Sequence, residues 1–311
     1  MSRKEDSLAA GFLDASAAQK YKRAEVATLP YAKIMVEKSG IAKHVKKGAS
    51  AHVLDFACGT GAVVQELYNS VPKEKWGNLK VRGTDMSPAM LEYLEARGKS
   101  EGWTGLETGV VDGNGIEDFD TCTDSDVFSA QDDITQMLPK STFTHIFVSF
   151  AIIVLPPHTL QRLQTLLQPG GYIAVTSWAS VPWYSLFARS VSLMSLPQPY
   201  CPSSQEVQDK FCGNWGLESY MVQQLEEAGL QDVDSLEEKR SICCGTPDVW
   251  TTSMQFPLGV AVKTWWEQGK RDAQLGELNG VMKKVATENL AENGEVEMEF
   301  DGVVGWGWKS G

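Results

Sequence analysis

The sequence lacks any hydrophobic run long enough to cross a membrane, and it has no excess of positive charge. The longest apolar stretch, residues 146–156, is shorter than the ~20 residues of a membrane-spanning helix and suits a buried strand with its loop. The start of the sequence, residues 1–6, contains no apolar h-region, so we expect no secretory signal. A formal net charge of −12 disfavours a general nucleic-acid binder. We therefore expect a cytoplasmic protein that binds neither membranes nor nucleic acids.

Cysteine forms no recognisable pair in this chain. The six cysteines lie at irregular spacing without a CxxC motif, which favours reduced thiols and no metal site. Cys243 and Cys244 are neighbours, and we expect both thiols to be buried. Apolar residues make up 42% of the chain, as is ordinary for a folded protein, and the length of 311 residues allows two domains or one α/β domain with insertions.

Short apolar runs alternate with helical segments from residue 51 onward. This alternation indicates a doubly wound parallel sheet. Residues 7–38 also have helical spacing, and Pro30 predicts a break between two helical segments there. In the sheet region we predict strands at 51–56, 79–84, 106–111, 143–150 and 172–177, and helices at 62–69, 89–100 and 158–167.

Residues 113–135 interrupt this alternation of predicted strands and helices. Eight carboxylates and no Lys or Arg lie between Asp112 and Asp133, both included. Because no dense DxDxDG loop is present, we interpret the stretch as a solvated insertion rather than a metal site.

The segment 53–61, Val-Leu-Asp-Phe-Ala-Cys-Gly-Thr-Gly, carries the most chemical information. Gly59 and Gly61 allow the backbone to turn sharply from strand to helix and to approach a ligand closely. The following helix points unpaired N–H groups toward a polar or anionic group. The segment therefore predicts a cofactor loop, and a tight turn without a ligand is the alternative.

Two cofactors are compatible with this turn, a nicotinamide dinucleotide and S-adenosylmethionine. The dinucleotide fingerprint has a small residue three positions after its second glycine, where Val64 stands, and it does not require Asp55 inside the strand. Asp85 ends the second predicted strand and can accept both hydroxyls of a ribose. That acid suits either cofactor, because both contain adenosine.

Four segments, in the right order, resemble motifs of the class I S-adenosylmethionine-dependent methyltransferases. Residues 53–61 are similar to the cofactor loop, and residues 83–87, Gly-Thr-Asp-Met-Ser, to the segment with the ribose-binding acid. Residues 166–172, Leu-Leu-Gln-Pro-Gly-Gly-Tyr, resemble the turn before the fifth strand, and residues 225–233 the junction before the sixth.

A narrower resemblance extends to about residue 240. It is to fungal secondary-metabolite methyltransferases, and nearest to a bis-thiomethyltransferase that methylates both thiols of a reduced dithiol natural product. The residues that carry it are 18–21, 36–40, 102–103, 143–148 and 176–178.

The resemblance implies an α/β fold of the Rossmann-like class I methyltransferase type, with a seven-stranded, mostly parallel sheet, N-terminal helices and a helical lid. Residues 1–50 would form an N-terminal helical cap, and residues 51–180 the core that binds S-adenosylmethionine. Residues 181–311 would add lid helices and C-terminal strands to the same domain. We expect a monomer or a homodimer.

The resemblance also implies which residues hold the methionine portion of the cofactor. Gly59 and Gly61 would approach it closely, and Ala57 and Cys58 would line it. Asp55 would orient the loop or hold the amino group through a water molecule.

The ribose and the adenine would be bound by the next loops. Asp85 would bind the ribose, and Met86 would flank the adenine as a polarizable apolar plate. Asp112, with Gly113 beside it, would accept the adenine amino group, while Asp132 lies in a segment that resembles the same motif and is the alternative.

Aromatic residues after the fourth and fifth strands would face the reacting groups. Phe150 would lie beside the methyl sulfonium, and Tyr21, Trp178 and Trp183 would bind the acceptor. Core packing is the alternative for Phe150 and Trp178. His158 is the candidate for a general base, with a capping or surface role as its alternative.

These features predict transfer of a methyl group to a small-molecule acceptor of secondary metabolism, with a thiol favoured by the resemblance. A thiol has an unperturbed pKa of ~8.5 and ionises partly by itself, whereas an alcohol usually needs a base. The asparagine-proline-proline-aromatic motif of many nucleic-acid methyltransferases is absent from residues 151–157. The alternatives are O- or N-methylation of a natural product, and a methyltransferase-like protein that binds the cofactor but acts as a ring-forming catalyst or regulator.

Overall fold

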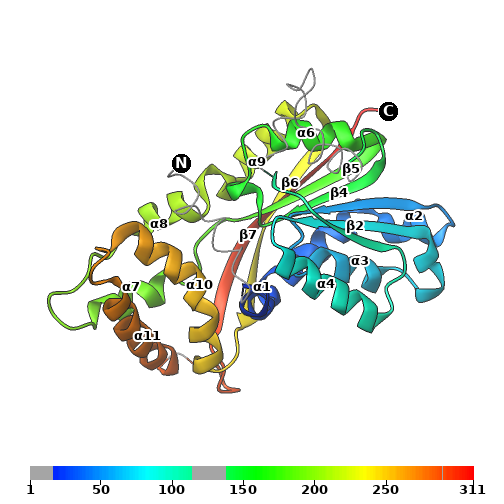
Figure 1. Cartoon of the computed structure of the whole chain (residues 1–311). Helices are drawn as coiled ribbons and strands as arrows, with labels where there is room; N and C mark the ends of the chain where they lie inside the picture. The colour runs from blue at the N-terminus through cyan, green and yellow to red at the C-terminus, as the bar shows by residue number, and fades with distance from the viewer. Residues whose placement is uncertain (1–16, 114–137, 289) are drawn as a thin grey trace, which may run out of the picture.

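Seven strands form the central sheet of the computed structural model, in the order β3-β2-β1-β4-β5-β7-β6 (Figure 1). Neighbouring strands among β1 to β5 are parallel, whereas β7 runs antiparallel to both β5 and β6. The predicted fold is therefore confirmed. The structure describes residues 17–113, 138–288 and 290–311. The strands are β1 Ala51–Phe56, β2 Leu79–Asp85, β3 Leu106–Val110, β4 Phe143–Ser149, β5 Leu167–Trp178, β6 Leu230–Cys243 and β7 Glu297–Lys309.

Helices cover both faces of the sheet and form a further group beside its long last strands. In Figure 1, α2, α3 and α4 lie on one side of the sheet, α6 and α9 on the other, and α7, α10 and α11 beside β7. The helices are α1 Ala17–Ser39, α2 Ile41–Lys46, α3 Ala62–Ser70, α4 Pro88–Glu101, α6 Thr159–Leu166, α7 Tyr184–Ser192, α8 Ser204–Phe211, α9 Glu218–Glu227, α10 Pro247–Trp265 and α11 Arg271–Thr287.

The alternation of side chains along β4 explains why helices pack on both faces. Successive strand residues point to opposite sides, so Ile146 and Val148 pack in one core and Phe147 in the other. Leu160 and Leu163 of α6, three residues apart, lie on the same helix face and are buried with Ile146 and Val148. Because β4 is buried on both faces, its sequence is a nearly continuous run of apolar residues.

The predicted helix break at Pro30 is wrong, because α1 runs without interruption from Ala17 to Ser39. A proline inside a helix loses one backbone hydrogen bond and costs roughly 3 kcal/mol or more. The flanking residues Ala27, Tyr31 and Met35 are buried, and burial of large apolar side chains contributes about 1.5–3 kcal/mol each. Packing of this face therefore offsets the cost of the proline.

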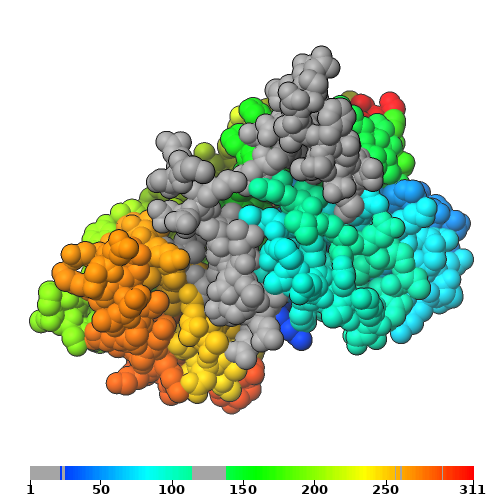
Figure 2. Space-filling model, in the orientation of Figure 1, coloured from blue at the N-terminus to red at the C-terminus, as the bar shows by residue number. Residues whose placement is uncertain are grey.

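The C-terminal part of the sheet also extends beyond the sequence prediction. β5 begins at Leu167 rather than at residue 172, because Leu167 pairs with Phe143 before a register shift. The long strands β6 and β7 reach past β5, and a separate apolar cluster of α7, α10 and α11 packs on them. Figure 2 shows α10 and α11 on one side of the molecule and the core helices α3 and α4 on the other. Within the described part of the chain, no helix is both long and apolar enough to span a membrane.

Candidate active site

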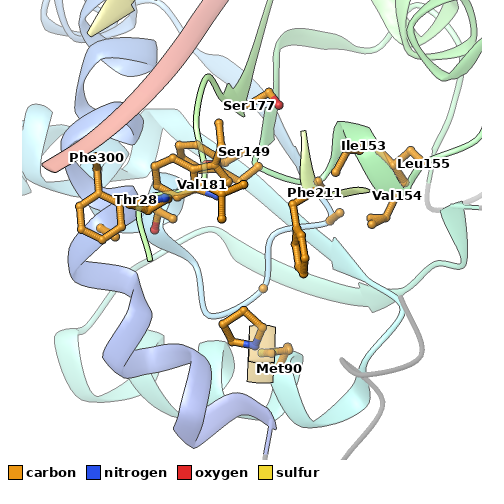
Figure 3. A pocket seen from close by; sticks show the side chains of 18 of the residues that line it. Thr28, Met90, Ser149, Ile153, Val154, Leu155, Ser177, Val181, Phe211 and Phe300 are labelled. Atoms are coloured by element: carbon orange, nitrogen blue, oxygen red, sulfur yellow. The ribbon is translucent and has the colours of Figure 1, made fainter. Parts of the chain in front are cut away.

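A cavity of about 270 Å³ opens at the edge of the sheet where the parallel strands β1 to β5 end. Ligands of open α/β sheets bind at this carboxyl edge. The loops after these strands form part of the wall, and residues of α1, α4, α8, α10 and β7, together with Cys244, complete it. In Figure 3, Thr28 and Phe300 lie at one end of the view, and Ile153, Val154 and Leu155 at the other.

Most of the residues predicted from the sequence to bind ligands meet in this cavity. They come from the ends of the five parallel strands β1 to β5 and the loops that follow, which the sheet brings to one edge. The predicted residues that line it are Ala57, Gly59, Asp85, Met86, Asp112, Gly113, Phe150, Trp178 and Trp183.

The loop after β1 adopts a tight turn with a left-handed backbone. Ala57 has φ 56°, Gly59 φ 52° and Gly61 φ 88°. The N–H of Cys58 donates to the carbonyl of Thr84 at 2.9 Å, which fastens the loop to the end of β2. Gly61 is the N-cap residue of α3, so the turn leads directly into the N-terminus of that helix.

Asp85 holds this loop from the neighbouring strand. Its Oδ2 accepts the N–H of Gly59 and its Oδ1 accepts the N–H of Ser87, each at 2.9 Å. Burial raises the pKa of Asp85, and the backbone N–H groups partly offset that rise. The carboxylate lines the cavity with acceptor capacity to spare, because each of its oxygens has two lone pairs.

Asp55 lies beneath the loop and is almost fully buried. Within the described structure neither of its carboxylate oxygens has a hydrogen-bond partner of good geometry, and the nearby backbone N–H of Val64 only partly opposes the rise of its pKa. Burial is the main cause that raises the pKa of Asp55 well above its usual range, and the charge of Asp85 adds to it. A cation at the loop would stabilise the ionised form of this carboxyl.

This burial predicts a pH-dependent gain of stability from the variant Asp55→Asn. The unfolded carboxyl ionises above pH ~4, whereas the folded one resists ionisation, so the wild type loses stability as the pH rises toward the raised folded-state pKa. Without cofactor, we expect the melting temperature of the variant to exceed that of the wild type at pH 8. This difference, or gap, should close toward pH 4. Melting curves across this range measure the gap, and the exposed Asp209→Asn is the control. An equal gap at all pH values would contradict the assignment.

The wall beyond Asp85 suits an apolar, planar group. Met86, Asp112 and Gly113 line it, and a Cβ on Gly113 would come within 2.5 Å of the Leu155 side chain. Asp132, the alternative to Asp112, lies outside the described residues, as does the rest of the predicted insertion from residue 114 to 135.

Aromatic rings form the wall beside the end of β5. Phe150, which has φ 53°, stacks on Trp178 with ring centroids 3.9 Å apart and an angle of 24° between planes. Tyr31 of α1 packs edge-on against both rings, at 5.3 Å from Phe150 and 5.6 Å from Trp178. Phe150 and Trp178 thus take part in core packing and also face the cavity.

Several predicted site residues do not line the cavity. Asp55, Cys58 and Gly61 lie behind the surface of the loop. His158 is exposed at the N-cap of α6, where its carbonyl accepts the N–H of Arg162, so the structure does not bring this candidate base to the cavity. Tyr21 belongs to α1, but its side chain lies outside the described part.

Other titratable residues differ in their surroundings. His145 is a core residue: it is buried beside Thr144, and burial lowers its pKa to about 4. The expected burial of both neighbouring cysteines is wrong, because Cys243 is exposed. Cys244 is half-buried, lines the cavity and has a pKa that burial raises to about 12. Among the described residues, no group of three potential metal ligands gathers.

Sequence reasoning missed the contribution of α10 to the cavity. This helix presents the buried Trp250, together with Ser253, Met254 and Pro257. Its N-terminus carries a visible signal, since Thr246 accepts the N–H of Val249 and a proline follows as the first helical residue. The docking of the helix over the cavity has no comparable local signal.

Comparisons with known proteins identify a matching family, two similar fungal proteins and one similar solved structure. Residues 47–237 match the model of the methyltransferase domain family. The chain is similar to the methyltransferase tpcH of Aspergillus fumigatus, with 24% identity over 90% of this chain and 91% of that protein. It is also similar to the acetylaranotin bis-thiomethyltransferase of Aspergillus terreus, with 28% identity over 74% and 73%. Phosphoethanolamine N-methyltransferase 2 of Haemonchus contortus, solved with S-adenosylmethionine, matches at 13% identity and a TM-score of 0.43, over 88% of this chain and 53% of that one.

Proposed function

The chain belongs to the methyltransferase domain family, and we propose that it methylates a thiol of an uncharged, apolar secondary metabolite. It is an S-adenosylmethionine-dependent methyltransferase of the fungal secondary-metabolite type. Of the two cofactors that residues 53–61 admit, S-adenosylmethionine is therefore the one it uses. The nature of the acceptor is the part that we propose.

The residues around the cofactor loop fit S-adenosylmethionine. The glycine turn leaves room for a close approach, and Asp85 presents a carboxylate that is already fixed by two backbone N–H groups. We assign the methionine portion to the loop at Gly59, the ribose to Asp85, and the adenine to Met86 and Asp112. The unpartnered, buried Asp55 would favour the ammonium group. When bound, the cofactor supplies an activated methyl group on a sulfonium.

The chemistry of the cavity wall carries the proposal about the acceptor. The charged side chains of the described lining are Asp85 and Asp112, both at the assigned cofactor end. Toward α10 the lining is apolar or bears hydroxyls, as with Trp250, Met254 and Ser253. Such a wall favours an uncharged acceptor that is bound by burial of apolar area.

A thiol fits this wall better than a nucleophile that must be deprotonated by the protein. Since a thiol ionises partly on its own, the chain needs mainly to orient the acceptor and exclude water, and positioning of this kind can supply on the order of 7–11 kcal/mol. The stacked pair Phe150 and Trp178 would orient a flat acceptor. The bis-thiomethyltransferase relative from Aspergillus terreus supports the same acceptor class.

Three acceptors of one shape test the proposal: ortho-xylylene dithiol, ortho-xylylene diol and ortho-xylylene diamine. Each is incubated with the enzyme and isotope-labelled S-adenosylmethionine, and mass spectrometry counts the methyl groups transferred. We expect S-methylation of the dithiol, with kcat/KM rising with pH as the acceptor thiol ionises. Preference for the diol or diamine would overturn the thiol assignment. Binding of S-adenosylhomocysteine without any methyl transfer to the dithiol would overturn it as well.

A further inference from the structure

Helix α1 makes a direct polar connection to the cofactor loop through Glu25. This carboxylate is 4% exposed, and its Oε2 accepts the hydroxyl of Thr60 at 2.7 Å. Thr60 is the residue between Gly59 and Gly61 and is itself buried. A side chain from residue 25 therefore fixes the centre of the turn that follows β1.

Arg97 of α4 completes this connection. Its Nη1 forms an ion pair with Glu25 Oε1 at 2.8 Å and lies 3.4 Å from the carbonyl oxygen of Thr60, to which it donates. Its Nη2 donates to the side chain of Gln65 on α3. Glu25, Thr60 and Arg97 form a closed polar triangle, here called the loop clamp, in which each member contacts the other two.

The same turn of α1 that carries Glu25 also forms part of the acceptor-side wall. Val26, Ala27 and Thr28 line the cavity, and the hydroxyl of Thr28 donates to the carbonyl of Glu25 at 3.1 Å. Figure 1 shows α1 between the core helices α3 and α4 and the group of α7, α10 and α11. Any shift of this turn relative to Thr60 changes the distance between the cofactor loop and the wall.

We propose that Glu25 is a positioning residue, which sets the spacing between the cofactor loop and the acceptor wall through the loop clamp. A buried ion pair with well-formed hydrogen bonds fixes one relative placement of its partners. In-line transfer is sensitive to such placement, since an error of about 1 Å can lower a rate by about 100-fold. The inference rests on the cofactor assignment and holds for any acceptor nucleophile.

The variant Glu25→Asp tests position without removing charge, because it retracts the carboxylate by about one carbon–carbon bond, ~1.5 Å. Calorimetry with S-adenosylhomocysteine should give a Kd raised about tenfold, and hydrogen exchange should show faster exchange of the amides of residues 57–61. With ortho-xylylene dithiol, kcat should fall more than KM changes. The matched control is Glu37→Asp on the same helix, whose side chain is 64% exposed and forms a surface ion pair with Lys33.

A second pair of variants keeps the inference testable if Glu25→Asp folds poorly. Thr60→Val removes the hydroxyl that Glu25 accepts, whereas Thr60→Ser keeps it, so Thr60→Ser should lose much less affinity for S-adenosylhomocysteine. Combining Thr60→Val with Glu25→Asp should be less than additive, since both break the same contact. Wild-type affinity and wild-type loop exchange in Glu25→Asp, or equal affinities of the two Thr60 variants, would overturn the proposal. So would a lower melting temperature with unchanged Kd and kcat.

Discussion

The variant Asp85→Ala is expected to weaken the binding of S-adenosylhomocysteine by at least about 100-fold. Each hydrogen bond to a charged group contributes about 1.5–3 kcal/mol, so loss of two ribose contacts amounts to two orders of magnitude or more. The substitution also removes the acceptor of the N–H groups of Gly59 and Ser87, which hold the loop against the end of β2. Both effects act on cofactor affinity in the same direction.

Isothermal calorimetry measures this loss directly, without an acceptor. Asp85→Asn is the informative second variant, because its amide oxygen can still accept one backbone N–H while the charge is lost; we expect an intermediate affinity. Glu92→Ala, an exposed acid on α4, is the control and should bind as the wild type does. Wild-type affinity in Asp85→Ala would refute the ribose assignment.

The cofactor loop could be predicted from the sequence because its signals are local. The turn at Gly59 and Gly61 needs a left-handed backbone, which glycine adopts readily, and both residues have positive φ in the structure. Asp85 was predictable from its place at the end of a strand, because parallel strands bring their carboxyl ends to one edge. The assignment of roles to these residues stays a prediction until cofactor binding is measured.

The remaining walls of the cavity depend on contacts between segments far apart in the chain. Glu25 meets Thr60 across 35 positions, and Trp250 of α10 reaches the cavity from the C-terminal third of the chain. No periodicity or short motif carries such information. For His158 the sequence signal was misleading. Its position after the fourth strand predicted a place at the carboxyl edge of the sheet, but the backbone turns at the start of α6 and leaves the side chain exposed.

The variant Gly61→Ala is expected to lower both stability and cofactor affinity, for two separable reasons. A left-handed conformation costs an L-residue about 1–2 kcal/mol, and Gly61 has φ 88°. Its added Cβ would also clash with Cδ1 of Leu94, a fully buried side chain that packs close to Gly83 as well. Overpacking of a filled core costs typically 1–3 kcal/mol, so we expect a total loss of about 2–5 kcal/mol.

Gly48→Ala separates the two causes, because Gly48 has φ 92° but nothing within 4 Å of an added Cβ. This control should lose only the strain, about 1–2 kcal/mol, and keep wild-type affinity for S-adenosylhomocysteine, since it lies before β1 and away from the cavity. Gly61→Ala should lose more stability in urea titrations and bind S-adenosylhomocysteine at least about tenfold more weakly, because the clash displaces the turn that Asp85 and Glu25 hold. Equal losses of stability in the two variants, with unchanged affinity in both, would show that the close approach to Leu94 does not shape the cofactor loop.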